Sequence, residues 1–394
     1  MKRIIGYCIA FLLLTAEVCG KQVKSDLSVL YVGGSPEIET MIHNPEPAVL
    51  EKSVRKRTAA FEKLLRRYFR NVEVVSARDY LPEMSDRYDV TIMDGTPREL
   101  QPAQEIVNEE GMIISRRNPA YLPEDFDRPM VFIAEAGDIV GTRIGVKTDW
   151  YCLCLDADAH HFNKEHPIFH GPFEVNISVE LKPTPSEAFR FVRTDGQPLP
   201  DSLEMWRVQT KGYKTEEGFR PEMIARPWGF ADSPDAEYIS GGVSAKDIDA
   251  VAMGRHGNFF FWGFSASPEN MTDEAQTVFA NAVAYISKFA GQTPIARRYK
   301  SDIATREYAV QQKDFISYKR WQERMVVEKQ YIEKTEEIKK VALAKQAKGE
   351  KLTSEEKAAL RSTVKLQSYA EWLKSREPVL FEKFGDNEQA YKDY

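Results

Sequence analysis

Apolar and polar residues follow one another in blocks through the first third of the chain. Residues 27–34 read LSVLYVGG, an apolar run stopped by two glycines, which predicts a buried strand entering a tight turn. Residues 58–69 carry apolar side chains at helical spacing, at Phe61, Leu64, Leu65, Tyr68 and Phe69. Further apolar or β-branched runs lie at residues 72–79, 88–95, 111–115 and 128–138. Strands that alternate with helices in this way predict a parallel sheet covered on both faces.

A second patterned region ends the globular part of the sequence. Residues 250–265 predict two strands joined by a glycine-rich hairpin around residues 254–258. A helix follows, with Thr272 as its N-cap, acidic residues in its first turn and Gly291 at its end. Its broad apolar stripe predicts packing on the sheet. Residues 175–250 are rich in proline and turns and predict short strands and loops that extend one edge.

Beyond about residue 292 the composition shifts to Lys, Glu, Gln and Ala, and residues 305–348 have high helix propensity. After a break at Gly349, Thr353 and Glu356 form the pattern of a capping box that opens a second helix, which ends before Pro378. The two helices predict an αα-hairpin. Five apolar residues of this segment could dock it on the main domain or on a second copy: Phe315, Tyr318, Trp321, Met325 and Ile332. The alternative is a solvated, charged helix with one packed apolar stripe, which the same residues also fit.

These patterns predict an α/β fold: a flavodoxin-like, doubly wound and mostly parallel sheet over residues 21–292, with a C-terminal α-helical extension over residues 293–394. Sheets of this kind bind ligands at the carboxyl ends of their strands. We therefore expect the functional side chains to lie at the carboxyl ends of the strands.

The first twenty residues predict a secretory signal. Lys2 and Arg3 precede an apolar run from Ile4 to about Leu14, which is too short to cross a bilayer. Cleavage after Gly20 would send the mature protein to the periplasm or the medium, and lipid attachment at Cys19 is the alternative.

The charge and cysteine content limit the classes of partner and scaffold that this chain can have. The formal net charge of −6 becomes −7 once the signal, with two cations and one anion, is removed, and such a protein has no nucleic-acid signature. Only Cys152 and Cys154 of the 4 cysteines would remain after cleavage, so a disulfide-stapled scaffold is excluded. No membrane span is expected.

Residues 151–173, YCLCLDADAHHFNKEHPIFHGPF, concentrate reactive side chains. On a strand, Asp156, Asp158 and His160 would share one face and could hold zinc, manganese or iron, although aspartates also stabilise turns. Cys152 or Cys154 could act as a nucleophile beside a histidine, or be a small buried hydrophobe. We assign no metal or other cofactor, and we expect His160 to be the member of this cluster that reaches a pocket.

Three segments together resemble the trehalose-utilisation-type (ThuA-like) branch of the class I glutamine amidotransferase-like superfamily. They are the opening LSVLYVGG, the turn HPIFHGPF at residues 166–173, and the segment GRHGNFFFWGFSASPENMTDEAQTVFANAVAYISKF at residues 254–289. The resemblance covers roughly residues 27–290 and leaves the C-terminal helices unexplained. It implies the doubly wound fold and an association with sugar utilisation, although one fold hosts many functions.

The sequence departs from the amidotransferases at their nucleophile. That superfamily implies a Gly-x-Cys-x-Gly elbow and a later His-x-Glu pair. Here the strand at residues 130–134 leads into AEAGD, with Glu135 where a thiol would stand, and no His-x-Glu follows. We therefore do not expect glutamine hydrolysis.

A pocket at the strand ends is the preferred site. We expect Glu135 and His256 to act as acid and base, and Arg255 to bind a carboxylate or phosphate through paired hydrogen bonds. The expected ligand-binding residues are Gly33, Gly34, Asp94, Arg255, His160 and Trp228, with Gly95 beside them. For GRHGN the alternative is a plain hairpin whose polar side chains face water.

Trp228 and Phe230 lie near carboxylates in a turn-rich stretch, where aromatic rings often stack on sugars, and a loop anchored by core aromatics explains the same residues. The resulting hypothesis is an exported domain that binds or modifies a carbohydrate or related small polar metabolite. The alternative is a non-catalytic scaffold that assembles, as a homo-oligomer or with a partner, through its C-terminal helices.

Overall fold

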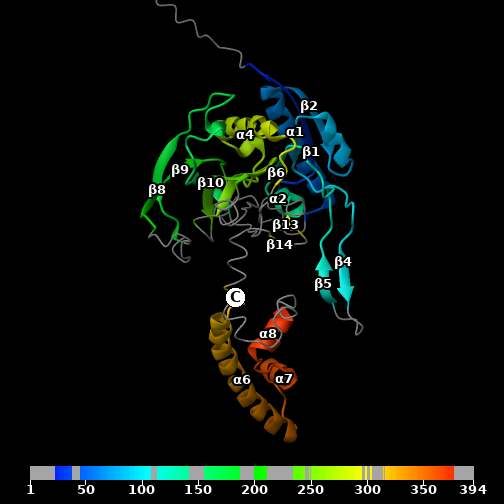
Figure 1. The fold of residues 1–394 in the computed structure, drawn as a ribbon, viewed down its shortest axis with the longest axis vertical. Helices are drawn as coiled ribbons and strands as arrows, with labels where there is room; N and C mark the ends of the chain where they lie inside the picture. The colour runs from blue at the N-terminus through cyan, green and yellow to red at the C-terminus, as the bar shows by residue number, and fades with distance from the viewer. Residues whose placement is uncertain are drawn as a thin grey trace, which may run out of the picture. The chain divides into compact units, whose positions relative to one another are not determined.

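The structure, a computed structural model of the chain, describes residues 23–37, 45–107, 113–141, 155–186, 199–210, 234–244, 248, 250–294, 298–299, 302–303, 314 and 316–376. Two compact units divide the chain, Met1–Asp302 and Ile303–Tyr394. A ten-stranded mixed sheet and its covering helices form the first unit, and helices form the second (Figure 1).

The first half of the sheet is parallel. Its strands, in spatial order, are β2 (Phe69–Ser76), β1 (Ser25–Gly33), β3 (Val90–Met93), β6 (Met130–Ile133) and β12 (Phe259–Trp262). Each neighbouring pair in this series runs in the same direction. The strands predicted near residues 27–34, 72–79 and 88–95 are confirmed. Buried aliphatic and aromatic residues fill β3, β6 and β12, as both-face burial requires.

The second half is antiparallel, so the expectation of a mostly parallel sheet is corrected. The sheet continues from β12 through β11 (Val251–His256), β10 (Ala236–Ser244), β7 (Leu155–His160), β9 (Ser202–Arg207) and β8 (Val179–Pro183). Every contact in this half is antiparallel. The sequence that connects these strands is rich in proline and turn residues, and such a composition does not favour the crossover helices that parallel pairing needs.

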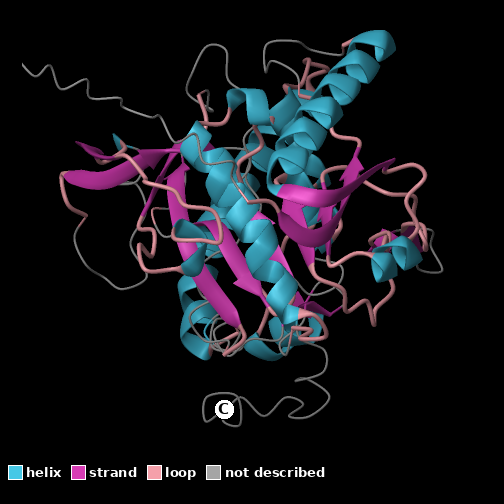
Figure 2. Cartoon of the chain, turned by 90° about the horizontal axis from the view of Figure 1, so that it is seen from above, coloured by secondary structure: helices cyan, strands magenta, loops and turns pink. Residues whose placement is uncertain are grey.

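Helices cover both faces of the sheet (Figure 2). On one face lie α1 (Pro47–Tyr68) and α4 (Asp273–Ile286), whose Phe61 and Phe279 rings pack 5.8 Å apart. On the other face the short α2 (Glu135–Ile139) packs with Phe261 of β12. The predicted Thr272 cap of α4 is confirmed, because its side chain accepts a hydrogen bond from Ala275 N.

One predicted strand lies elsewhere. Residues 111–115 were expected in the parallel sheet, but β5 (Ile113–Arg117) pairs antiparallel with β4 (Gln104–Val107) as a separate hairpin (Figure 1). The described first unit also contains 3₁₀ turns at Pro82–Arg87, Pro167–Phe169, Pro268–Asn270 and Ser287–Phe289, and the two-residue strand β13 (Arg298–Tyr299). The two-residue strand β14 (Asp302–Ile303) spans the boundary between the two units. Within the described ranges, no helix has both the length and the apolar character needed to cross a bilayer.

The second unit contains α6 (Tyr318–Ala347), α7 (Ser354–Arg361) and α8 (Tyr369–Arg376). The break at Gly349 and the capping box of Thr353 with Glu356 are confirmed. The single second helix is wrong, because residues 362–368 are not helical. β-Branched Thr363 and Val364 weaken the helix there, and Ser368 caps a new one with Glu371. Tyr318 and Trp321 pack on Tyr369 within this unit.

Candidate functional site

The carboxyl ends of β1, β3, β6 and β12 meet at one edge of the sheet, here called the carboxyl edge. The structure brings the predicted Gly33, Gly34 and Asp94 together there. Ser35 N donates to the backbone oxygen of Asp94 at 3.1 Å. A Cβ at Gly95 would lie only 2.8 Å from Gly34 Cα, so the two turns approach more closely than any side chain allows.

A buried ion pair lies beneath these turns. The Arg57 guanidinium of α1 binds Asp94 through two hydrogen bonds, Nε to Oδ2 at 2.7 Å and Nη2 to Oδ1 at 2.8 Å. Tyr31 donates its hydroxyl to Asp94 Oδ2 at 2.5 Å. Burial and then the Asp94 charge raise the pKa of Tyr31 well above its ordinary value. Burial alone would lower the pKa of Arg57, but Asp94 reverses this effect and raises it.

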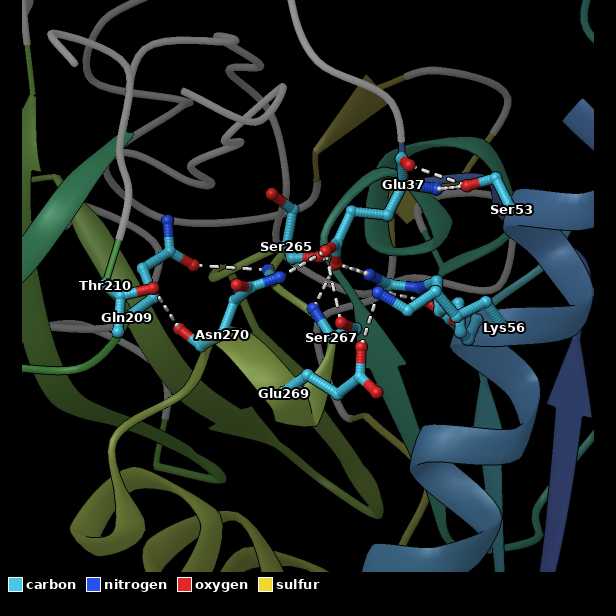
Figure 3. Close-up of polar contacts among 12 residues, drawn as sticks. Glu37, Ser53, Lys56, Gln209, Thr210, Ser265, Ser267, Glu269 and Asn270 are labelled. Carbon is cyan, nitrogen blue, oxygen red and sulfur yellow. Dashed lines mark hydrogen bonds and ion pairs between the residues drawn. The ribbon is translucent and has the colours of Figure 1, made fainter. Parts of the chain in front are cut away.

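Glu37 joins three segments at the carboxyl edge (Figure 3). Arg57 Nη1 donates to Glu37 Oε2 at 2.9 Å and to the backbone oxygen of Ser265 at 2.5 Å. Glu37 also accepts hydrogen bonds from Ser267 N, from Ser267 Oγ at 3.1 Å and from Asn270 Nδ2 at 2.7 Å. The carboxylate therefore fixes the loop after β1 to α1 and to the loop after β12.

Sequence reasoning missed both Arg57 and Glu37. A signal for Arg57 is present, because it precedes Phe61, Leu64, Leu65 and Tyr68 on the same buried helix face and is itself only 4% exposed. A charged residue in such a stripe indicates a buried partner. Glu37 lies in a loop with no periodic pattern, so nothing local marks it.

Two buried polar atoms beside this network have no hydrogen-bond partner among the described residues: Gln209 Nε2 and Ser265 Oγ. The other end of the Gln209 amide is held in place, because Oε1 accepts from Ala266 N at 3.2 Å. Figure 3 shows the Gln209 nitrogen and the Ser265 hydroxyl directed to the same side of the loop after β12. An unpaired buried polar group costs about 1–3 kcal/mol, so the pair suits a bound molecule that supplies hydrogen bonds.

The turn from β6 into α2 has a strained backbone. Ala134 adopts φ 46° and ψ −118°, a conformation that residues other than glycine rarely hold. Strand, strained turn and helix follow one another as in a nucleophile elbow, but the strained residue carries only a methyl group. The predicted Glu135 is the first residue of α2, one position beyond the strained residue.

The predicted meeting of Glu135 with Arg255 and His256 is wrong. His256 pairs with Phe259, and Phe259 pairs with Met130 at the start of β6. The hairpin of Arg255 and His256 therefore lies at the opposite edge, where the parallel strands begin. The three residue steps from Met130 to Ile133 place this amino edge about 10 Å from the end of β6 that leads to Glu135. The hairpin itself is confirmed, with Gly257 at φ 57° in its turn.

Arg255 belongs instead to a closed polar cluster at that amino edge. Its Nε binds Glu237 Oε2 at 2.8 Å, and Glu237 also accepts from Tyr285 at 2.9 Å and contacts His166 Nε2 at 3.3 Å. Burial would raise the pKa of Glu237, but hydrogen bonds from His166 and Arg255 outweigh it and lower the pKa to about 2. The Phe289 ring lies 4.0 Å from the guanidinium. These groups satisfy one another, which indicates a structural role.

His160 is fully buried on β7, opposite Gly241 of β10. Its Nδ1 lies 2.8 Å from Nδ1 of His161, and burial together with this neighbour lowers the pKa of His160 to about 3. Asp158, two residues away, pairs with Lys182 at 2.9 Å. The described residues contain no group of three His, Cys, Asp or Glu placed to hold a metal. Trp228, Cys152 and Cys154 lie outside the described residues.

The sequence matches no family model and no curated protein. Among solved structures, it is similar to a Bacteroides uniformis ATCC 8492 protein provisionally described as ThuA-like. The alignment covers 73% of this chain and 98% of that chain, at 11% identity and a TM-score of 0.34. The class of protein is defined by the chain's own elements: an α/β protein with a mixed ten-stranded sheet, a polar carboxyl edge and C-terminal helices.

Proposed function

We propose that residues 21–292 form a ThuA-like domain that binds a neutral, hydroxyl-bearing small molecule, of the carbohydrate class, at the carboxyl edge. The spatial order β2-β1-β3-β6-β12 supports a flavodoxin-like parallel half, because it is the 2-1-3-4-5 order of that fold. Such sheets bind ligands at the point where the strand order reverses, which here lies between β1 and β3. Gly34 and Asp94 follow those two strands.

The electrostatics favour a neutral ligand. Asp94 and Glu37 already hold the Arg57 charge, and Lys56 at the same edge pairs with Glu269 at 2.7 Å. Beside this network, the buried polar atoms without a partner among the described residues are an amide nitrogen at Gln209 and a hydroxyl at Ser265. An amide donor and a hydroxyl, which both donates and accepts, complement sugar hydroxyls. These two unpaired atoms are the observation on which the proposal depends.

The strained turn at Ala134 favours ligand binding over covalent catalysis. Ala134 offers no nucleophile, and Arg255 and His256 lie at the other edge of the sheet. Glu135 stays a candidate acid or base for a hydrolytic step. The protein is thus proposed as a sugar-binding domain of the ThuA-like type that does not hydrolyse glutamine.

Calorimetric titration with trehalose, glucose and sucrose tests the proposal. We expect at least one of these sugars to bind, and Ser265→Ala and Gln209→Met each to weaken that sugar about 3- to 10-fold, the value of one hydrogen bond. Ser28→Ala is the matched control, because Ser28 bonds Asp89 near the start of β1, away from this edge. Absence of binding by all three sugars, or equal binding by all variants, contradicts the proposal.

Export stays part of this proposal. It predicts that protein recovered from the periplasm or medium begins at Lys21. N-terminal sequencing of that fraction checks the cleavage, and an intact Met1 in the exported protein would contradict it.

An assembly role is the second candidate, and it depends on α6. Val326, Val327 and Tyr331 are 60%, 64% and 54% exposed, which is unusual for apolar side chains on one helix. A partner that binds there should be lost with Val327→Lys and Tyr331→Lys, while sugar binding is unchanged. Co-purification of the wild type and both variants from the native host separates this role from the first.

A further inference from the structure

The strand β8 forms an outer edge of the sheet with a self-complementary sequence. It pairs with β9 on one side and is the last strand in the sheet order. Its side chains are open to solvent, with Leu181 73% and Val179 37% exposed. Figure 1 shows β8 at the outer side of the first unit. Exposed edges with apolar side chains are templates for pairing with a further strand.

The register between β8 and β9 shows which backbone groups of β8 face outward. Thr184 N donates to Asp201 O at 2.9 Å, so residue 184 points its backbone toward β9. Because these directions alternate in an antiparallel pair, Lys182 and Glu180 also point inward, and Leu181 and Val179 point outward. Pro183, which has no N–H to give, is on the outward-facing set. The outward edge therefore offers the N–H groups of Val179 and Leu181 and the carbonyl groups of Val179, Leu181 and Pro183.

We propose that β8 pairs with β8 of a second copy of this chain, antiparallel and with a two-fold axis at Leu181. In this register Leu181 exchanges both backbone hydrogen bonds with its own copy. Val179 N–H donates to the carbonyl of Pro183 in the other copy, so the missing proline N–H affects only the ends of the ladder. The same contact is made twice, as an isologous interface requires.

Charge complementarity supports a second copy as the occupant. The two-fold register sets Glu180 opposite Lys182 of the other copy, twice per dimer. Glu180 is 72% exposed, and Lys182 is held by Asp158 at 2.9 Å and lies 3.5 Å from Glu180 of its own strand. Opposite charges placed directly across an antiparallel pair stabilise it, whereas like charges destabilise it. On the other face Leu181 covers Leu181.

Light scattering on the full-length protein tests the pairing. We expect a dimer for the wild type and a monomer for Leu181→Pro, which removes only an outward N–H. Since proline could disturb folding, Leu181→Lys is the second variant: it places like charges opposite each other and should raise the dimer dissociation constant at least about tenfold. Leu366→Lys, at another exposed leucine, is the matched control and should leave the dimer intact.

Oxidative cross-linking tests the register. Leu181→Cys should form a disulfide-linked dimer above the wild-type background, because residues directly opposite in this pairing have Cα atoms about 5.5 Å apart. Glu180→Cys should not, since its copies lie two residues out of register. A monomeric wild type overturns the proposal and leaves the edge to a strand of another protein. A dimer that survives Leu181→Pro, or that cross-links equally at both positions, also overturns it.

Discussion

The strained turn at Ala134 makes a quantitative prediction about stability. The residue has φ 46° and ψ −118° and is only 6% exposed. A non-glycine residue in such a conformation stores about 1–3 kcal/mol. Replacement by glycine removes the steric cause of this strain because glycine has no Cβ.

The substitution Ala134→Gly also has costs. The lost buried methyl is worth about 0.8 kcal/mol, and the extra backbone freedom of glycine in the unfolded chain costs about 0.5–1 kcal/mol. Relief of about 1–3 kcal/mol offsets these costs. The net change in the free energy of unfolding should therefore lie between a loss of about 0.8 kcal/mol and a gain of about 1.7 kcal/mol.

Ala136→Gly is the matched control. Ala136 lies two residues away in α2, is 4% exposed and has helical backbone, so its replacement has the same costs and no relief. We expect it to destabilise the first unit by about 1.3–1.8 kcal/mol. Ala134→Gly should thus be about 1–3 kcal/mol more stable than Ala136→Gly.

Urea unfolding followed by tryptophan fluorescence measures the difference, because Trp206 and Trp262 are buried in the first unit. The second unit contains Trp321 and Trp372, so the two transitions are fitted separately. Equal losses from the two substitutions would refute the strain at Ala134. The turn would then not resemble a nucleophile elbow in its energetics.

Three further predictions concern polar contacts. Asp94→Asn should cost about 3–5 kcal/mol in urea unfolding because it leaves the buried Arg57 charge poorly paired, whereas Tyr31→Phe should cost about 1 kcal/mol, and equal costs would contradict this. The pKa of Glu237 is lowered to about 2, so its ionised carboxylate stabilises the folded first unit above about pH 4.5, and this contribution is lost as the pH falls toward 2. Glu237→Gln should therefore reduce the pH dependence of the free energy of unfolding in this range by roughly 2 kcal/mol. An unchanged pH profile would contradict the role of this cluster. Thr353→Ala should remove about 1 kcal/mol from the second unit, seen as earlier loss of helical circular dichroism, with Lys351→Ala, at an exposed residue outside the helices, as the control.

Local patterns predict the parallel half of the sheet well because its central strands β3, β6 and β12 are short, mostly apolar and buried on both faces. The run at residues 88–95 becomes β3, and the Thr272 cap begins α4 as its side-chain chemistry requires. The antiparallel half is harder to predict. Strands such as β8 are short and exposed on most of their positions, so their pattern does not separate them from loops.

The buried polar network at the carboxyl edge cannot be predicted from local sequence patterns, for a different reason. Glu37 and Asn270 lie more than 200 positions apart in the sequence and meet only because β1 and β12 end at the same edge. Their pairing depends on the full strand order. By contrast, the position of Asp94 at this edge can be predicted from sequence, because it directly follows a strand whose direction is set by the alternation of strands and helices.

The direction of the Arg255–His256 hairpin is nevertheless encoded locally. Two strands joined by a two-residue turn must run antiparallel, so only one of β11 and β12 can be parallel to β6. The second strand leads through a loop into α4, which packs on the sheet as the helix of a β-α unit does, and this makes β12 the parallel strand. The turn before a parallel strand lies at its amino end. Residues that flank that turn therefore lie away from the carboxyl edge, whereas Ser265, in the loop after β12, lies at it.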